Sequence, residues 1–270
     1  MSKNEEGKEM SFLGHLEELR WRLVRSSSVI IVAAIVIFYF TDPIVNHVYL
    51  AMSKTDFLTY RFFCWLSNSF GLSDILCAND IPIQIQSIEM TKQFSTNMYF
   101  ALIGGLVISF PFTFYQLWSF VKPGLKSQEV KITKGVVLNA SLLFFTGIFF
   151  GYYMISPLCV QFFGGYKLTD EIQNNFTISS YMSMITTSTF LSGLFFELPV
   201  VMYLLTKLGI LSSRVLKKYR KHALVVILIL SALITPPDVI SQLLVTIPIY
   251  LLFELGVFVT SKVEKQKNKE

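Results

Sequence analysis

The sequence predicts an all-α, polytopic membrane protein. Apolar residues make up 53% of the 270 residues and charged residues only 15%, and the mean hydropathy is +0.54, which lies outside the range of soluble domains. The charges crowd into short segments and leave six long apolar segments between them. Because such a chain cannot bury its apolar surface in one water-soluble core, the bilayer is its expected solvent.

The six apolar segments are the expected membrane spans of a single domain, residues 1–270. Most reach the roughly 17 to 25 residues that a membrane-spanning helix needs. The fifth has only twelve residues, so it is a short span, a re-entrant hairpin, or a helix in a thinned membrane. We expect spans at about residues 23–40, 98–121, 135–160, 181–206, 223–234 and 239–260.

Lysine and arginine residues orient the predicted bundle. Nineteen of the 23 lie in the two terminal tails and in residues 122–134 and 207–222, and four lie in the alternate segments. Cytoplasmic segments carry the excess of basic residues, so both termini are predicted to be cytoplasmic, which requires an even number of spans. The basic residues form short patches rather than one stripe, which argues against a nucleic-acid partner.

Residues 41–93 form the largest segment outside the spans, and we expect a periplasmic cap with some helix there. Cys64 and Cys77 lie thirteen residues apart in it. In an oxidising periplasm they could form a disulfide, although sequence alone cannot fix a pairing, and two free buried cysteines are the alternative. Cys159 has no obvious mate.

Signatures of catalysis are missing. All three histidines lie outside the expected spans, and the sequence has no zinc-binding helix, nucleophile elbow or phosphate-binding loop. We therefore expect no enzyme, no metal and no cofactor. Any energy input would come from the membrane potential, a proton gradient or a partner.

Two polar clusters flank the first two spans. Residues 12–22 carry apolar side chains at helical spacing, which predicts an interfacial helix over residues 1–22, if only as a membrane anchor. Residues 114–125 are an aromatic run of the kind common at membrane boundaries. Glu129 then follows as the only acid in a segment with four lysines. It could pair with a neighbouring lysine or accept a guanidinium from a ligand.

A third cluster lies at membrane depth. Glu197 falls inside the fourth apolar segment, where an ionised carboxylate costs roughly 2.5 to 3.5 kcal/mol, so it must be protonated, hydrated or partnered. Pro199 removes a backbone donor and should kink the helix beside this acid. Residues 235–242 and Glu254 add polar groups to the last two spans. Glu197 is therefore a candidate functional residue.

Five short motifs run along the chain. They are H-L-x-E-L-R-x-R from His15, Y-Q-x-W-x-F-x-x-P-x-L from Tyr115, F-E-L-P from Phe196, T-P-P-D-V-x-S-Q from Thr235 and I-P-x-Y-x-L-F-E-x-G from Ile247. Together, and in this order, they resemble the TatC family, the polytopic subunit of the twin-arginine protein translocase. Each motif alone is weak, but the set covers the chain from the N-terminal helix to the last span.

The resemblance implies a cupped, six-span receptor in the bacterial cytoplasmic (inner) membrane, with short fifth and sixth helices. It would bind Arg-Arg signal peptides of folded cargo proteins. It would also form homo-oligomers and assemble with TatA- and TatB-type single-span proteins for export driven by the proton-motive force. By the family's motifs, the peptide-binding residues would be Glu18 and Glu129, helped by Leu19, Arg20, Phe120 and Pro123. The intramembrane polar patch that binds the partners would be Glu197, Thr235 and Gln242.

Two features depart from the family's pattern. Val130 and Lys131 stand where the family often has two arginines, and residues 41–93 are longer than in many relatives. A proton-coupled secondary transporter of a small solute, with Glu197 as a proton relay, is the rival hypothesis. Such transporters carry internal repeats, and the sequence offers no convincing one. An intramembrane enzyme ranks third, since nucleophile and metal ligands are missing.

Overall fold

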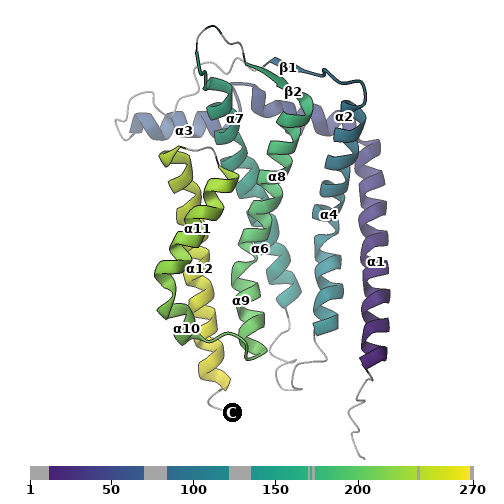
Figure 1. Ribbon diagram of the computed structural model, residues 1–270, viewed down its shortest axis with the longest axis vertical. Coiled ribbons are helices and arrows are strands. Elements are labelled where there is room, and N and C mark those ends of the chain that lie inside the picture. Colours follow the sequence, from purple (N-terminus) through teal and green to yellow (C-terminus); the bar gives the residue numbers. More distant parts are fainter. Residues whose placement is uncertain are drawn as a thin grey trace, which may run out of the picture.

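The computed structural model describes residues 12–69, 84–121, 135–169, 171, 174–235 and 238–267. These residues are mostly helical, and the long helices run side by side along one direction (Figure 1). Short helices and two strands gather at one end of the bundle, here named the cap end. At the opposite end, here named the tail end, α1 (Phe12–Tyr39) begins, α4 (Lys92–Val121) ends and α10 (Ser213–Lys218) lies.

Five described helical stretches are long and apolar enough to cross a membrane. This confirms the predicted all-α polytopic class. The fifth expected span corresponds to α11, Arg220–Ile234, whose 15 residues extend about 22 Å at 1.5 Å per residue. That is less than the roughly 30 Å of a typical hydrocarbon core, so the sixth crossing stays a prediction. The five stretches are Leu16–Tyr39, Lys92–Val121, Val136–Gly165, Ile178–Lys207 and Ser241–Gln266.

Helix α1, Phe12–Tyr39, is continuous over 28 residues. We expected an interfacial helix over residues 1–22; its described part forms the first turns of α1, and its position at the membrane surface stays a prediction. No glycine or proline interrupts this helix after Gly14, so nothing in the sequence breaks the helical hydrogen bonding between the polar turns and the apolar ones. At 1.5 Å per residue, α1 is about 42 Å long, and so it exceeds the thickness of the hydrocarbon core.

Helix α1 packs antiparallel against α4, Lys92–Val121. Two glycines of α4 allow this close contact. A Cβ atom added to Gly105 would lie 2.7 Å from the backbone nitrogen of Ala34 and 2.8 Å from the carbonyl oxygen of Ile30. Small residues at helix crossings in membranes let two backbones approach closely in this way. The α1–α4 pair therefore depends on backbone contact rather than on large side chains at this point.

The cap end consists of short helices and strands, whereas the sequence predicted only a cap with some helix. β1 and β2 pair in parallel, with Ile85 opposite Phe176, and this strand pair was not predicted. Tyr49 and Tyr181 anchor the cap to the bundle, because the Tyr49 hydroxyl lies 2.7 Å from Thr186 Oγ1 and the Tyr181 hydroxyl donates to the Tyr49 carbonyl. The elements are α2 (Thr41–Ile44), η1 (Val45–Tyr49), η2 (Leu50–Ser53), α3 (Leu58–Ser69), β1 (Gln84–Gln86) and β2 (Asn175–Thr177).

The remaining helices complete the bundle. The third expected span consists of three consecutive helices, α6, η5 and α7. The fourth is interrupted at Glu197, between α8 and α9, as Pro199 predicted. Helix α12 packs against α9 and α11 around the buried residues Met202, Val245 and Ile249. The bounds are α6 (Val136–Phe150), η5 (Gly151–Ile155), α7 (Ser156–Gly165), α8 (Ile178–Phe196), α9 (Leu198–Lys207), α10 (Ser213–Lys218) and α12 (Val239–Lys267).

Candidate functional site

A partly buried ion pair joins α1 to α4 near the tail end. Glu18 and Arg22 lie one turn apart on α1, and Oε1 of Glu18 accepts from both Nε of Arg22, at 3.0 Å, and Nη2. The third nitrogen, Nη1, donates to the carbonyl oxygen of Gln116 on α4 at 3.4 Å. The guanidinium thus bridges the predicted receptor carboxylate and the aromatic motif that begins at Tyr115.

The second carboxylate oxygen of Glu18, Oε2, takes no part in the pair with Arg22. Oε2 is buried and has no hydrogen-bond partner among the described residues, whereas the side chains of Arg22 and Glu18 are 19% and 25% exposed. A carboxylate can accept about four hydrogen bonds, and a buried acceptor without a partner is rare enough to require an explanation. Glu18 therefore retains unused capacity for a donor such as a second guanidinium.

The other predicted peptide-binding residues are only partly placed by the structure. Leu19 is partly buried and Arg20 is exposed, both on α1 beside Glu18. Phe120 lies in the last turn of α4, one turn beyond Gln116 toward the tail end. Glu129 and Pro123 lie outside the described residues. The structure therefore links Glu18 through Arg22 to Gln116, five residues before Val121, while its relation to Glu129 stays a prediction.

The predicted intramembrane patch is not joined by hydrogen bonds in the described part of the chain. Glu197, at the α8–α9 break, is 6% exposed, and neither of its carboxylate oxygens has a hydrogen-bond partner within the part of the chain that the structure describes. Thr235 donates to the carbonyl of Ser231 at 2.8 Å, and Gln242 donates to the carbonyl of Leu228 at 3.2 Å. Thr235 and Gln242 thus both bond to α11, whereas Glu197, between α8 and α9, bonds to neither of them.

One polar contact was missed by the sequence reasoning. Nη2 of Arg220 on α11 lies 2.7 Å from Oε2 of Glu254 on α12, and the hydroxyl of Tyr250 donates to the same carboxylate at 3.2 Å. Glu254 was visible as an acid in an apolar segment. Its partner stands 34 positions away, and no periodic pattern connects the two. This ion pair ties α11 to α12.

Asp238 explains the acidic position of the T-P-P-D motif. Its Oδ2 accepts from the backbone N–H of Ser241 at 2.7 Å, which is the bond that an N-cap residue makes to the first turn of a helix. The aspartate thus caps the start of α12. Glu264 acts similarly on α10, since its Oε1 accepts from the backbone N–H of Ser213 at 2.9 Å.

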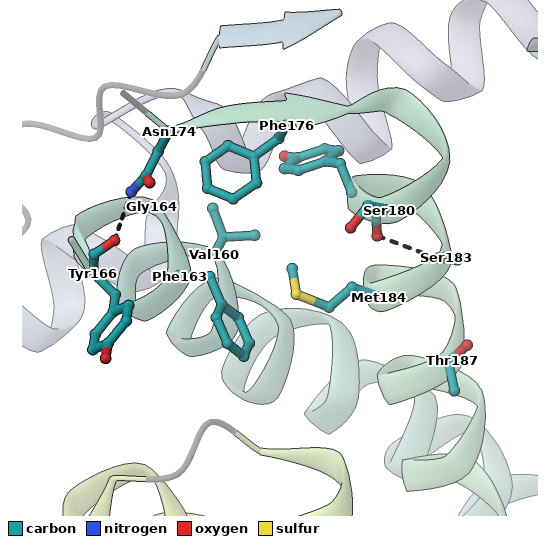
Figure 2. A pocket seen from close by; sticks show the side chains of 11 residues that line it. Val160, Phe163, Gly164, Tyr166, Asn174, Phe176, Ser180, Ser183, Met184 and Thr187 are labelled. Carbon is teal, nitrogen blue, oxygen red and sulfur yellow. Dashed lines mark hydrogen bonds between the residues drawn. The ribbon is translucent and has the colours of Figure 1, made fainter. Parts of the chain in front are cut away.

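A cavity of about 620 Å³ opens at the cap end between α7, β2 and α8 (Figure 2). Phe163, Phe176 and Met184 supply apolar walls, and Asn174 at its rim donates to the carbonyl of Tyr166 at 2.6 Å. Among the described residues, none that lines the cavity is charged, and none belongs to the predicted sites. The described lining therefore supplies no carboxylate for the recognition of arginine.

The cap holds one disulfide-bonded cysteine, and a free cysteine lies in α7. Cys64 is disulfide-bonded, Cys159 is free and buried, and Cys77 lies outside the described residues, so the predicted pairing stays a prediction. Burial raises the pKa of Tyr49 to about 12. Within the described ranges, no group of three histidine, cysteine, aspartate or glutamate side chains could hold a metal ion.

Comparison with known proteins yields consistent matches. The model of the family described as "Sec-independent protein translocase protein (TatC)" matches residues 14–248. A Sec-independent protein translocase protein TatC from Blattabacterium sp. subsp. Periplaneta americana is 35% identical over 98% of this chain and 100% of that protein. TatCy from Bacillus subtilis is 33% identical over 97% of this chain and 92% of that protein.

A solved structure matches as well. The crystal structure of a twin arginine translocase receptor, TatC in DDM, superimposes with a TM-score of 0.70 at 26% identity. The match covers 91% of this chain and 99% of that chain. Sequence and fold comparisons therefore agree along nearly the whole length.

Proposed function

Because the chain belongs to the TatC family of Sec-independent protein translocase proteins, a family of multi-pass membrane proteins, we propose that it is the receptor and core subunit of a twin-arginine translocase. In this role it binds the Arg-Arg pair of signal peptides on folded proteins and assembles with TatA- and TatB-type single-span partners. The proton-motive force drives the export. The tail end faces the cytoplasm, in line with the distribution of basic residues.

The observation that carries this proposal is the state of Glu18. Its carboxylate is partly shielded from water and is linked through Arg22 to Gln116 on α4, and its Oε2 accepts from no described residue. A guanidinium presents parallel N–H donors that match a carboxylate, whereas an ammonium group is a point charge without that geometry. Partial burial strengthens the interaction, because the local dielectric constant is lower than in water. Glu18 thus suits arginine better than lysine.

The end of α4 adds to this preference for cations. The last four carbonyl groups of a helix have no partner within the helix, and the C-terminal end of the helix dipole is negative. Phe120 lies in this last turn. A second arginine of the same peptide would require a further acceptor nearby, and Glu129 is our candidate on the grounds of the family motif.

Crosslinking of a peptide tests the proposal. We expect a signal peptide with an Arg-Arg pair to crosslink to the purified protein, and the Lys-Lys version to do so at least tenfold less, because two charge-assisted hydrogen-bond pairs lose their fork geometry. Glu18→Ala or Glu129→Ala should abolish the crosslink without changing membrane insertion.

A matched control replaces an acid at the other end of the bundle. Asp56 forms only a loose, exposed ion pair with Arg61 at 3.7 Å in the cap, so Asp56→Ala should leave crosslinking unchanged. Unchanged crosslinking in the Glu18 and Glu129 variants would refute the proposed site.

A further inference from the structure

We propose that the ion pair between Arg22 and Glu18 blocks the carboxylate when no peptide is bound. An arginine of the peptide must then displace Arg22 from Glu18 in order to bind. This inference rests on the proposed function, since it concerns how the same carboxylate is held before it meets a ligand. It makes Arg22 a residue that sets the affinity of the receptor.

The geometry of the pair carries the first step. Nε and Nη2 of Arg22 both point to Oε1 of Glu18, so the guanidinium covers one oxygen and leaves Oε2 buried without a partner. A fork-to-fork pair would satisfy both oxygens. The resting pair is therefore incomplete, and an incoming guanidinium that bonds to both oxygens gains the hydrogen bond that Arg22 does not make.

The position of Arg22 on α1 explains why its pairing is incomplete. Glu18 and Arg22 belong to adjacent turns of one helix, where pairs four residues apart can meet. At the same time, Nη1 of Arg22 reaches across to the carbonyl of Gln116 on α4. Because the side chain is held by both helices, it approaches the carboxylate from one side only. A free peptide is not constrained in this way.

A displaced Arg22 has an acceptor within reach. It is already bonded to the Gln116 carbonyl, five residues before Val121, the last described residue of α4. The negative end of the helix dipole also favours a cation there. Arg22 therefore keeps a hydrogen-bond acceptor when a ligand arginine takes its place on Glu18, and its charge is not left unpaired in this partly buried place, which would be costly.

The thermodynamic consequence is specific. If the binding-competent state is only fractionally populated, the apparent affinity of every ligand falls by that fraction. Arg22 should therefore lower the affinity for Arg-Arg and Lys-Lys peptides by the same factor, whereas the preference for arginine over lysine comes from Glu18 itself. A residue that only supported the local fold would not produce equal gains for both ligands on removal.

The test measures the binding of fluorescent synthetic Arg-Arg and Lys-Lys peptides to the purified, full-length protein in lipid nanodiscs. We expect Arg22→Gln to increase the affinity for both peptides about fivefold. This is the change in affinity that corresponds to the loss of one partly exposed ion pair. Arg22→Lys keeps the charge but loses the fork, so it should tighten both peptides by a smaller factor. The Arg22→Lys variant also provides the test if Arg22→Gln fails to fold.

Arg25→Gln is the matched control, because Arg25 lies on the same helix, is exposed and forms no ion pair with the described residues. It should change the affinity less than twofold. Weaker or unchanged binding in both Arg22 variants would overturn the inference, and so would tightening equal to that of Arg25→Gln, which would be a general charge effect. Glu18→Gln separates the two claims: if it leaves Arg-Arg binding intact, the proposed function itself fails.

Discussion

At the scale of single residues, the predictions rest on two acids, the partly buried Glu18 and the buried Glu197. Both were visible in the sequence, Glu18 through its motif and Glu197 because an acid in an apolar segment is costly. The surroundings of each acid were not visible. That Arg22 takes only one oxygen of Glu18 depends on the packing of α4 against α1, and such contacts between distant segments leave no local pattern in a sequence.

Glu197 leads to the prediction for the partner site. Because its buried carboxylate has no bond in the described chain, we expect it to bond to a partner helix, and polar contacts between helices in lipid contribute about 0.6 to 2 kcal/mol each. Glu197→Ala should retain binding of the Arg-Arg peptide but reduce co-purification of the TatA- and TatB-type proteins severalfold. Glu197→Gln, which still forms hydrogen bonds, should retain most of it.

Normal recovery of both partners with Glu197→Ala would contradict this role. Loss of peptide binding in the same variant would show instead that Glu197 supports the tail-end site, and a thermal unfolding curve distinguishes that from a general loss of fold.

At the scale of elements, the long helices could be predicted and the short ones could not. Apolar segments bounded by charge, and Pro199 beside Glu197, identified the main helices and the α8–α9 break, because both effects act within a few residues of the chain. The β1–β2 pair consists of two strands of three residues, too short for a periodic pattern. The continuity of α1 from Phe12 to Tyr39 was also not predicted, because amphipathic spacing does not show whether a helix bends at the membrane surface.

The α1–α4 contact gives a prediction at this scale. Gly105→Leu would place side-chain atoms where the backbone of Ala34 already lies, and overpacking of this kind costs about 1 to 3 kcal/mol. We expect a lower thermal unfolding midpoint in detergent and, because α1 carries Glu18, weaker binding of the Arg-Arg peptide. Gly165→Leu is the matched control, since no atom lies within 4 Å of a Cβ at Gly165. Equal stability of the two variants would contradict the contact.

At the scale of the whole molecule, composition was sufficient to predict a polytopic membrane protein, because few other environments suit a chain that is 53% apolar. Its orientation rests on the positions of nineteen basic residues, and the number of crossings rests on whether the short helix α11 spans the membrane. Neither depends on side-chain packing. The proposed function combines the two scales, since Glu18 can meet a signal peptide only if the tail end faces the cytoplasm.

Photocrosslinking in inverted membrane vesicles tests this combined claim most directly. A photoreactive amino acid at Leu19, beside Glu18, should capture an Arg-Arg precursor added to the vesicles and should not capture its Lys-Lys version. The same amino acid at Tyr166, an exposed position at the cap end, should capture neither while the vesicles stay sealed and unenergised. Equal capture of both precursors at Leu19, or capture from Tyr166 alone, would contradict the account.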